Sequence, residues 1–128
     1  MNLAYVIAYV PDPPGSAAFW GSAFGLSVKF AHESGTYVEL DTGSTTLAFV
    51  STAQIEAQGI PFQPARPDED PLGIEVALST TDVDAAYTRA IDAGARPVHP
   101  PLTKPWGQIV AYVRDRDGIL VELCTPMG

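Results

Sequence analysis

The sequence PWGQIVAYVRDRDGILVELCTP, residues 105–126, carries the strongest local structural signal in the chain. Two segments of alternating apolar residues, 108–114 and 119–124, flank the tetrapeptide Asp-Arg-Asp-Gly at 115–118. Because Asp-Gly supplies the positive φ angle that a tight turn requires, this stretch predicts a β-hairpin.

Glu122 is a charged residue within the apolar segment Gly-Ile-Leu-Val-Glu-Leu-Cys, residues 118–124. Side chains alternate between the two faces of a strand, so Glu122 is expected on the same face as Leu120 and Cys124. A carboxylate on such a face needs a cation, a metal, a hydrogen-bond donor or a proton to offset its desolvation. The alternative is that Glu122 lies on an edge strand and only keeps the sheet soluble.

The hydrophobic pattern predicts two copies of one β-α-β-β-β order. A helix is expected from near Pro14 or Ser16 to Gly25, and a second over Ala85–Ala93. Residues 51–73, rich in proline and acidic residues, are expected to connect the copies, and could form a cover over a site or an irregular crossover. The strands are expected at Leu3–Val10, Ser27–His32, Thr36–Asp41 and Thr45–Val50 in the first copy, and at Ile74–Thr80, Arg96–His99, Gln108–Arg114 and Ile119–Cys124 in the second.

The two copies can be aligned by their turns and helix starts. Asp12 and Asp82 follow the first strand of each copy, and the resulting offset of 82 − 12 = 70 matches Tyr5 with Glu75. Gly43 and Gly118 close equivalent hairpins, and the offset of 118 − 43 = 75 matches Leu47 with Glu122.

Nearly the whole chain resembles the vicinal oxygen chelate superfamily, the glyoxalase, bleomycin-resistance and extradiol-dioxygenase group. The resemblance is carried by Tyr-Val-Pro-Asp at 9–12, Ala-Ala-Phe-Trp at 17–20, Asp-Val-Asp-Ala-Ala-Tyr at 82–87 and Arg-Asp-Arg-Asp-Gly-Ile-Leu-Val-Glu-Leu at 114–123. It implies an α+β fold of two tandem βαβββ modules whose curved mixed sheets surround a shared cavity. The single domain would cover residues 1–128, with module 1 at about 1–50, a linker at about 51–73 and module 2 at about 74–128. Proteins of this size in the family are usually homodimers.

The resemblance also implies where a divalent metal would be held in the enzymes of the group. The equivalent positions here are Tyr5, Leu47, Glu75 and Glu122. A leucine cannot ligate a metal, and a tyrosine would have to lose a proton of pKa about 10. His32 and His99 lie outside these positions. No metal is therefore favoured as a cofactor, and if one is bound, its ligands are expected to be Tyr5, Glu75 and Glu122.

We predict that the chain binds a small molecule without a catalytic metal, as the bleomycin-resistance branch implies. The ligand would be bulky and aromatic, with a positive charge that Glu75 and Glu122 could receive. The remaining candidate ligand-binding residues are Tyr5, Tyr9, Phe49, Trp106 and Tyr112. Tyr5, Tyr9 and Phe49 are expected on the concave face, although core packing is the alternative for each aromatic residue.

The runner-up is an enzyme of the same superfamily, a lyase, isomerase or dioxygenase in which Glu75 and Glu122 are the candidate catalytic residues. It could depend on a metal. It could also use acid/base chemistry alone, because repulsion between two carboxylates raises the pKa of one of them.

Composition limits the other functions. The net charge of −8 argues against nucleic acid and anionic membranes as partners. The longest apolar run, Leu3–Val10, is too short to span a bilayer and has no basic segment before it, so a cytoplasmic protein is expected. Cys124 is the only cysteine, which excludes an internal disulfide and favours a buried core residue.

Overall fold

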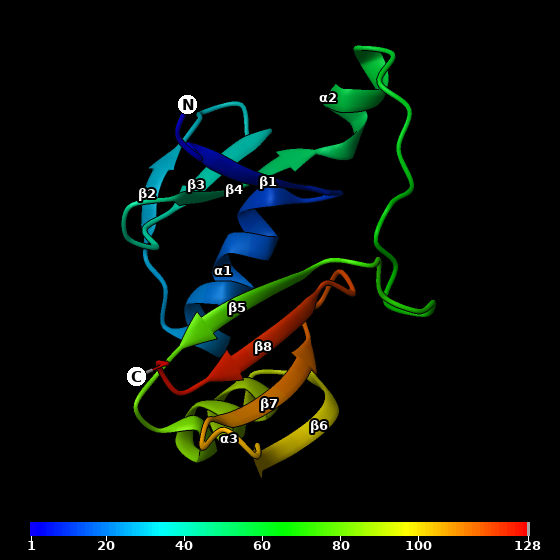
Figure 1. Ribbon diagram of the computed structural model, residues 1–128. Coiled ribbons are helices and arrows are strands. Elements are labelled where there is room, and N and C mark those ends of the chain that lie inside the picture. The colour runs from blue at the N-terminus through cyan, green and yellow to red at the C-terminus, as the bar shows by residue number, and fades with distance from the viewer. Residues whose placement is uncertain (128) are drawn as a thin grey trace. The chain divides into compact units, whose positions relative to one another are not determined.

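The computed structural model describes residues 1–127, and the chain divides into two compact units, the first covering Met1–Pro64 and the second beginning at Ala65. Both units are α+β and both have the βαβββ order (Figure 1). The prediction of two tandem βαβββ modules is confirmed.

The first unit has one four-stranded sheet with strand order β1-β4-β3-β2. β1 is parallel to β4, and β3 is antiparallel to both β4 and β2. The elements are β1 (Tyr5–Val10), α1 (Pro13–Phe24), β2 (Val28–Ala31), β3 (Tyr37–Leu40), β4 (Thr46–Ser51) and α2 (Thr52–Ala57).

The second unit repeats this arrangement with strand order β5-β8-β7-β6. β5 is parallel to β8, while β7 is antiparallel to β8 and β6. The elements are β5 (Glu75–Ser79), α3 (Val83–Asp92), β6 (Arg96–Thr103), β7 (Ile109–Arg114) and β8 (Leu120–Cys124).

Equivalent aspartates start the first helix of each unit. The Oδ1 atom of Asp12 accepts a hydrogen bond from the Gly15 N–H at 3.3 Å, and Oδ1 of Asp82 accepts one from the Ala85 N–H at 3.0 Å. Each bond satisfies a backbone donor that the first turn of a helix leaves without an intrahelical partner. At the other end of α1, Gly25 adopts φ 72° and its N–H donates to the carbonyl of Gly21, which ends the helix as predicted.

One face of each sheet packs against a helix. In the first unit the fully buried Trp20 of α1 lies edge-on to Phe49 of β4, with ring centroids 5.7 Å apart. In the second unit Val113 of β7 and Val121 and Leu123 of β8 are buried, as are Val83 and Ala90 of α3. The opposite face of each sheet, called the helix-free face below, carries the candidate site residues.

The segment expected to be a connection contains a short helix, α2, at its start. Ile55 of α2 is 7 % exposed, so this part of the segment is packed. Farther along, Phe62 lies edge-on to Tyr9 of β1, with ring centroids 5.0 Å apart. These few apolar contacts could not be recognised in a sequence dominated by prolines and acidic residues.

In the described part of the chain, no helix is long and apolar enough to cross a membrane.

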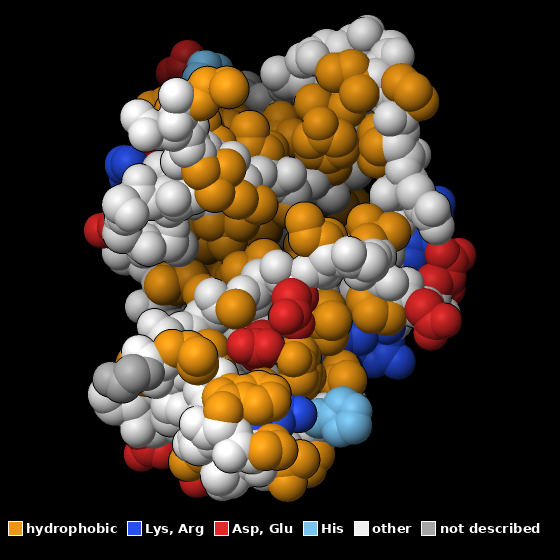
Figure 2. Space-filling model, in the orientation of Figure 1, with side chains coloured by type: hydrophobic (Ala, Val, Ile, Leu, Met, Phe, Trp, Pro, Cys, Tyr) orange, Lys and Arg blue, Asp and Glu red, His pale blue; other side chains and the backbone are white. Residues whose placement is uncertain are grey.

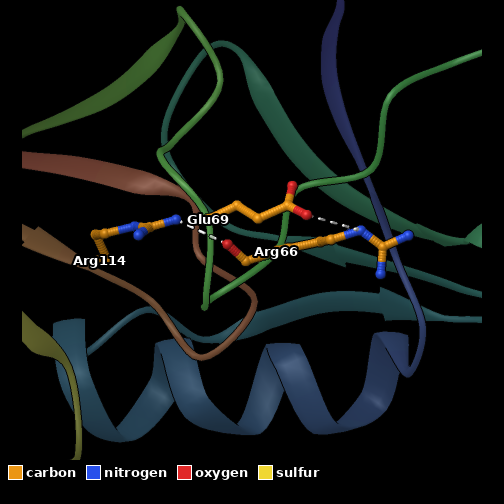
Figure 3. A network of polar contacts seen from close by, with 3 residues as sticks. All are labelled: Arg66, Glu69 and Arg114. Atoms are coloured by element: carbon orange, nitrogen blue, oxygen red, sulfur yellow. Dashed lines mark hydrogen bonds and ion pairs between the residues drawn. The ribbon is translucent and has the colours of Figure 1, made fainter.

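The start of the second unit is fastened to the β7–β8 hairpin through backbone carbonyls (Figure 3). Arg114 donates from Nη2 to the carbonyl oxygen of Arg66 at 2.8 Å and to that of Gly118 at 2.9 Å. Arg96, directly opposite Arg114 across β6 and β7, donates to the Pro67 carbonyl. The two guanidinium groups repel one another, and the hydrogen bonds that each donates to carbonyl oxygens offset this repulsion.

Gly118 lies where this fastened segment comes closest to the hairpin. Its φ is 92°, and a Cβ atom at this position would lie 2.5 Å from the Arg66 carbonyl oxygen. Such a distance is far shorter than any contact that a Cβ atom tolerates. Glycine is therefore required here both by the turn and by the neighbouring backbone.

Candidate functional site

Glu122 and Tyr112 are paired across β8 and β7 on the helix-free face of the second sheet. They are directly opposite in the strand register, and the Tyr112 hydroxyl donates to Oε1 of Glu122 at 2.7 Å. A hydrogen-bond donor was one of the partners expected for a carboxylate among apolar neighbours, and Tyr112 supplies it. Both side chains are half-buried.

Glu75 joins this pair from β5. Ala77 is directly opposite Glu122, and Glu75 lies two residues earlier on the same face of β5. The pKa of Glu75 is raised by burial first, then by the charge of Glu122 and by a hydrogen bond with Glu122. The two carboxyl groups are therefore close enough to share a proton. Acidic side chains lie among hydrophobic ones over this part of β5 and β8 (Figure 2).

Two side chains beside the carboxyl pair, those of Tyr112 and Cys124, have raised pKa values. The hydrogen bond to Glu122, followed by burial, raises the pKa of Tyr112 to about 12, so its hydroxyl remains a donor. Burial and then Glu122 raise the pKa of the Cys124 thiol. The ring of His99 on β6 lies edge-on to that of Tyr112, with centroids 6.3 Å apart. The site thus offers the negative charge of the carboxyl pair beside two aromatic rings.

Tyr5 and Tyr9 lie on the helix-free face of the first sheet, as predicted. Both alternate along β1 with residues that face α1, and Tyr5 is 50 % exposed. Tyr9 packs against Phe62, so part of its ring is covered from within its own unit.

Phe49 lies on the opposite face, and its expected position on the concave side is wrong. Its side chain is fully buried against Trp20 of α1. The reason is one extra residue in the first hairpin: five positions separate Gly43 from Ala48, whereas four separate Gly118 from Glu122. A shift of one residue moves every side chain of a strand to the other face.

The same shift means that Leu47 is not the residue equivalent to Glu122. Ala48 is directly opposite Ile7 on β1, as Glu122 is directly opposite Ala77 on β5. With Tyr5 matched to Glu75, the residue equivalent to Glu122 is therefore Ala48. Leu47 faces α1 and is 6 % exposed.

Trp106 lies in the turn between β6 and β7, where its indole Nε1 donates to Oε1 of Gln108 at 2.9 Å. Gln108 in turn donates to the carbonyl of Thr125 at 2.7 Å. With Gly107, Pro126 and Met127 these residues line a pocket of about 270 Å³. The pocket does not include Glu75, Tyr112 or Glu122, so the structure does not bring Trp106 together with the carboxyl pair.

The sequence interpretation missed Glu39, which lies on the helix-free face of the first sheet. Its Oε2 accepts a hydrogen bond from the Tyr37 hydroxyl at 2.7 Å. A signal was present, because Val38-Glu39-Leu40 repeats the tripeptide Val121-Glu122-Leu123. His99 was also set aside, because it lies outside the positions equivalent to the superfamily's metal ligands.

The comparisons with known proteins agree with this geometry. The family model described as Glyoxalase/Bleomycin resistance protein/Dioxygenase superfamily matches residues 2–123. The chain belongs to this superfamily. No curated protein gives a significant match.

Several solved structures have the same fold as this chain. A glyoxalase-related enzyme from Fulvimarina pelagi is similar over 100 % of this chain and 93 % of its own, with 22 % identity and a TM-score of 0.83. A protein of unknown function from Agrobacterium tumefaciens str. C58 covers 99 % and 95 %, with 24 % identity and a TM-score of 0.80. TioX from Micromonospora sp. ML1 covers 99 % and 100 %, with 25 % identity and a TM-score of 0.75.

The metal of the superfamily's enzymes does not fit the donors that this chain presents. The second unit offers Glu75 and Glu122, but Tyr112 and Cys124 beside them have raised pKa values and are held in their protonated forms. In the first unit the matching positions hold Tyr5 and the methyl group of Ala48. Within residues 1–127, no group of three or more His, Cys, Asp or Glu side chains could hold a metal ion. Divalent first-row metals usually take three or four such ligands.

Proposed function

We propose that this superfamily member binds a small organic cation on the helix-free face of its second sheet and sequesters it without a catalytic metal. The observation that carries the proposal is the carboxyl pair of Glu75 and Glu122, with Tyr112 bonded to Glu122 at 2.7 Å. A positive group between the two carboxyls replaces the shared proton and removes their repulsion.

An aromatic part of the ligand has partners on the same face. The rings of Tyr112 and His99 lie beside the carboxyl pair and supply apolar edges and π surfaces. The net charge of −8 attracts a cation at long range and repels an anion. Tyr5 and Tyr9 stay predicted ligand-binding residues of the first unit, and a homodimer stays the predicted assembly.

The proposal is tested by a thermal-shift screen of cationic aromatic compounds, followed by calorimetric titration of the best compound. We expect EDTA to leave the affinity unchanged, and Glu122→Gln and Glu75→Gln to weaken binding at least about tenfold, as charged pairs with good geometry do. Glu69→Gln, which removes a charge from an exposed side chain in the same unit, is the matched control.

Binding should also release protons. Because a cation favours the ionised form of Glu75, affinity should rise as the pH increases through the raised pKa of Glu75 and then level off. Titrations in buffers of different ionisation enthalpy measure the released protons. An uncharged analogue that binds as tightly as the cation, with no proton release, would refute the proposal.

A second candidate function is acid/base catalysis by the same carboxyl pair. It is favoured by the raised pKa of Glu75 beside Glu122, because a carboxyl that binds its proton more tightly than usual is better suited to act as a general acid. Isomerisation next to a carbonyl group suits such a pair. Turnover of a carbonyl compound that survives EDTA and disappears in both glutamine variants would favour catalysis over sequestration.

A further inference from the structure

A second carboxylate beside aromatic rings lies in the first unit. Tyr37 and Glu39 alternate along β3 and point to the helix-free face, because their register partners Val50 and Ala48 lie on that face. The Tyr37 hydroxyl donates to Oε2 of Glu39 at 2.7 Å, and this bond leaves Oε1 and further lone pairs of the carboxylate for another partner.

An aromatic side chain from the neighbouring strand lies beside this carboxylate. Phe30 of β2 is directly opposite Glu39, and its ring centroid lies 6.3 Å from that of Tyr37 at an interplanar angle of 52°. Phe30 is 48 % exposed, so its ring is accessible beside the carboxylate.

The basic group on the neighbouring strand does not pair with Glu39. Lys29 of β2 directs its Nζ to the Thr46 hydroxyl at 3.2 Å. The Tyr37 hydroxyl is the donor to the Glu39 carboxylate, and a neutral donor leaves the carboxylate its negative charge for a cation.

We propose that Phe30, Tyr37 and Glu39 form a binding site for a substituted ammonium ion in the first unit. The carboxylate attracts the charge, and the ring faces attract the methyl or methylene groups that carry it. A bare metal ion gains little here, because aromatic rings offer it no ligand atoms. An anion is repelled by Glu39. The site shares no residue with the Glu75–Glu122 pair, so it stands independently of the function proposed above.

Choline and its uncharged isostere 3,3-dimethylbutan-1-ol are suitable probes. We expect choline to give saturable shifts in the ¹H–¹⁵N spectrum of the full chain, centred on residues 30, 37 and 39. The uncharged isostere should bind at least tenfold more weakly, and magnesium chloride should not reproduce the shifts.

Four variants separate the site from its alternatives. Glu39→Gln and Phe30→Leu should each weaken choline binding at least tenfold, while Glu75→Gln should leave it unchanged. Tyr37→Phe keeps the carboxylate and the ring, so it should bind choline within about threefold of the parent. Far-ultraviolet circular dichroism checks that each variant is folded.

Two results would overturn the inference. The first is the absence of saturable choline shifts at residues 30, 37 and 39 in the parent. The second is undiminished choline binding by folded Glu39→Gln. Shifts that centre on residues 75, 112 and 122 instead, and vanish in Glu75→Gln, would contradict this site while supporting the function proposed for the second unit.

Discussion

Ala48 occupies, in the first sheet, the position that Glu122 occupies in the second. Each is directly opposite the third residue of the parallel first strand, Ile7 for Ala48 and Ala77 for Glu122. The two modules share a fold, but their hydrogen-bonded carboxylates lie on strands that are not equivalent. In the second, Glu122 on β8 accepts a hydrogen bond from Tyr112 on β7, while in the first, Glu39 and Tyr37 are both on β3.

Loss of the Tyr112 hydroxyl should destabilise the protein through Glu122. Tyr112→Phe removes the donor of a 2.7 Å bond to a half-buried carboxylate, and we expect the free energy of unfolding to fall by about 1 kcal/mol. Urea denaturation measures this change, and Tyr87→Phe on α3 is the control. Ultraviolet titration of the folded parent should show a tyrosine ionising with a pKa of about 12 that is missing from Tyr112→Phe. An unchanged titration curve would mean that the bond is absent in solution.

The raised pKa of Glu75 should make the stability of the protein depend on pH. A carboxyl whose pKa is higher in the folded state holds its proton more tightly there than in the unfolded chain. Its contribution to stability is therefore fully present below the unfolded pKa of about 4.3, and it is lost as the pH rises through the folded pKa. We expect the free energy of unfolding of the parent to fall over this range, and to fall less in Glu75→Gln. Urea denaturation at a series of pH values tests this, with Glu69→Gln expected to follow the parent.

The two hairpin glycines should differ in their tolerance of alanine. Gly43 has φ 100° with nothing near an added Cβ, so Gly43→Ala should cost only the left-handed backbone, about 1–2 kcal/mol. Gly118→Ala meets the same cost and also places its Cβ against the Arg66 carbonyl oxygen. We expect it to lose at least about 1 kcal/mol more. Equal losses in thermal or urea unfolding would show that residues 66–67 do not contact the hairpin.

Removal of Arg114 should loosen the segment that it holds. Arg114→Ala eliminates hydrogen bonds to the carbonyls of Arg66 and Gly118, so amide exchange over residues 65–70 should become faster. Cleavage by a glutamate-specific protease after Glu69 should also accelerate. Lys104→Ala, in the β6–β7 turn, is the matched loss of a positive charge and should leave both rates unchanged. If exchange and cleavage accelerate equally in both variants, the cause is the loss of a positive charge and not the loss of the Arg114 hydrogen bonds.

Much of the fold could be predicted from the sequence because its signals are local. Alternating apolar residues, helix-starting aspartates and turn glycines placed all eight strands of the described chain and the helices α1 and α3 within a few residues. The short helix α2 was missed because a single turn with one buried residue, Ile55, leaves almost no periodic pattern.

The candidate site could be predicted only in part, because it depends on strand register. Glu75, Glu122 and Tyr112 were all named as candidate ligand-binding residues, and the structure brings them together on one face. Phe49 was assigned to the wrong face because a single added residue in a turn cannot be seen in a hydrophobic pattern. The Tyr37–Glu39 bond was missed because each residue alone looks like an ordinary strand residue.

The fastening of residues 66 and 67 has a consequence for how the sequence can vary. Arg96 and Arg114 bind main-chain oxygens, which every amino acid supplies in the same place. Side chains at 66 and 67 can therefore be exchanged in natural or engineered variants without loss of the attachment. Arg96, Arg114 and Gly118 cannot be exchanged in this way. Mutational tolerance should therefore be high at residues 66 and 67 and low at these three positions.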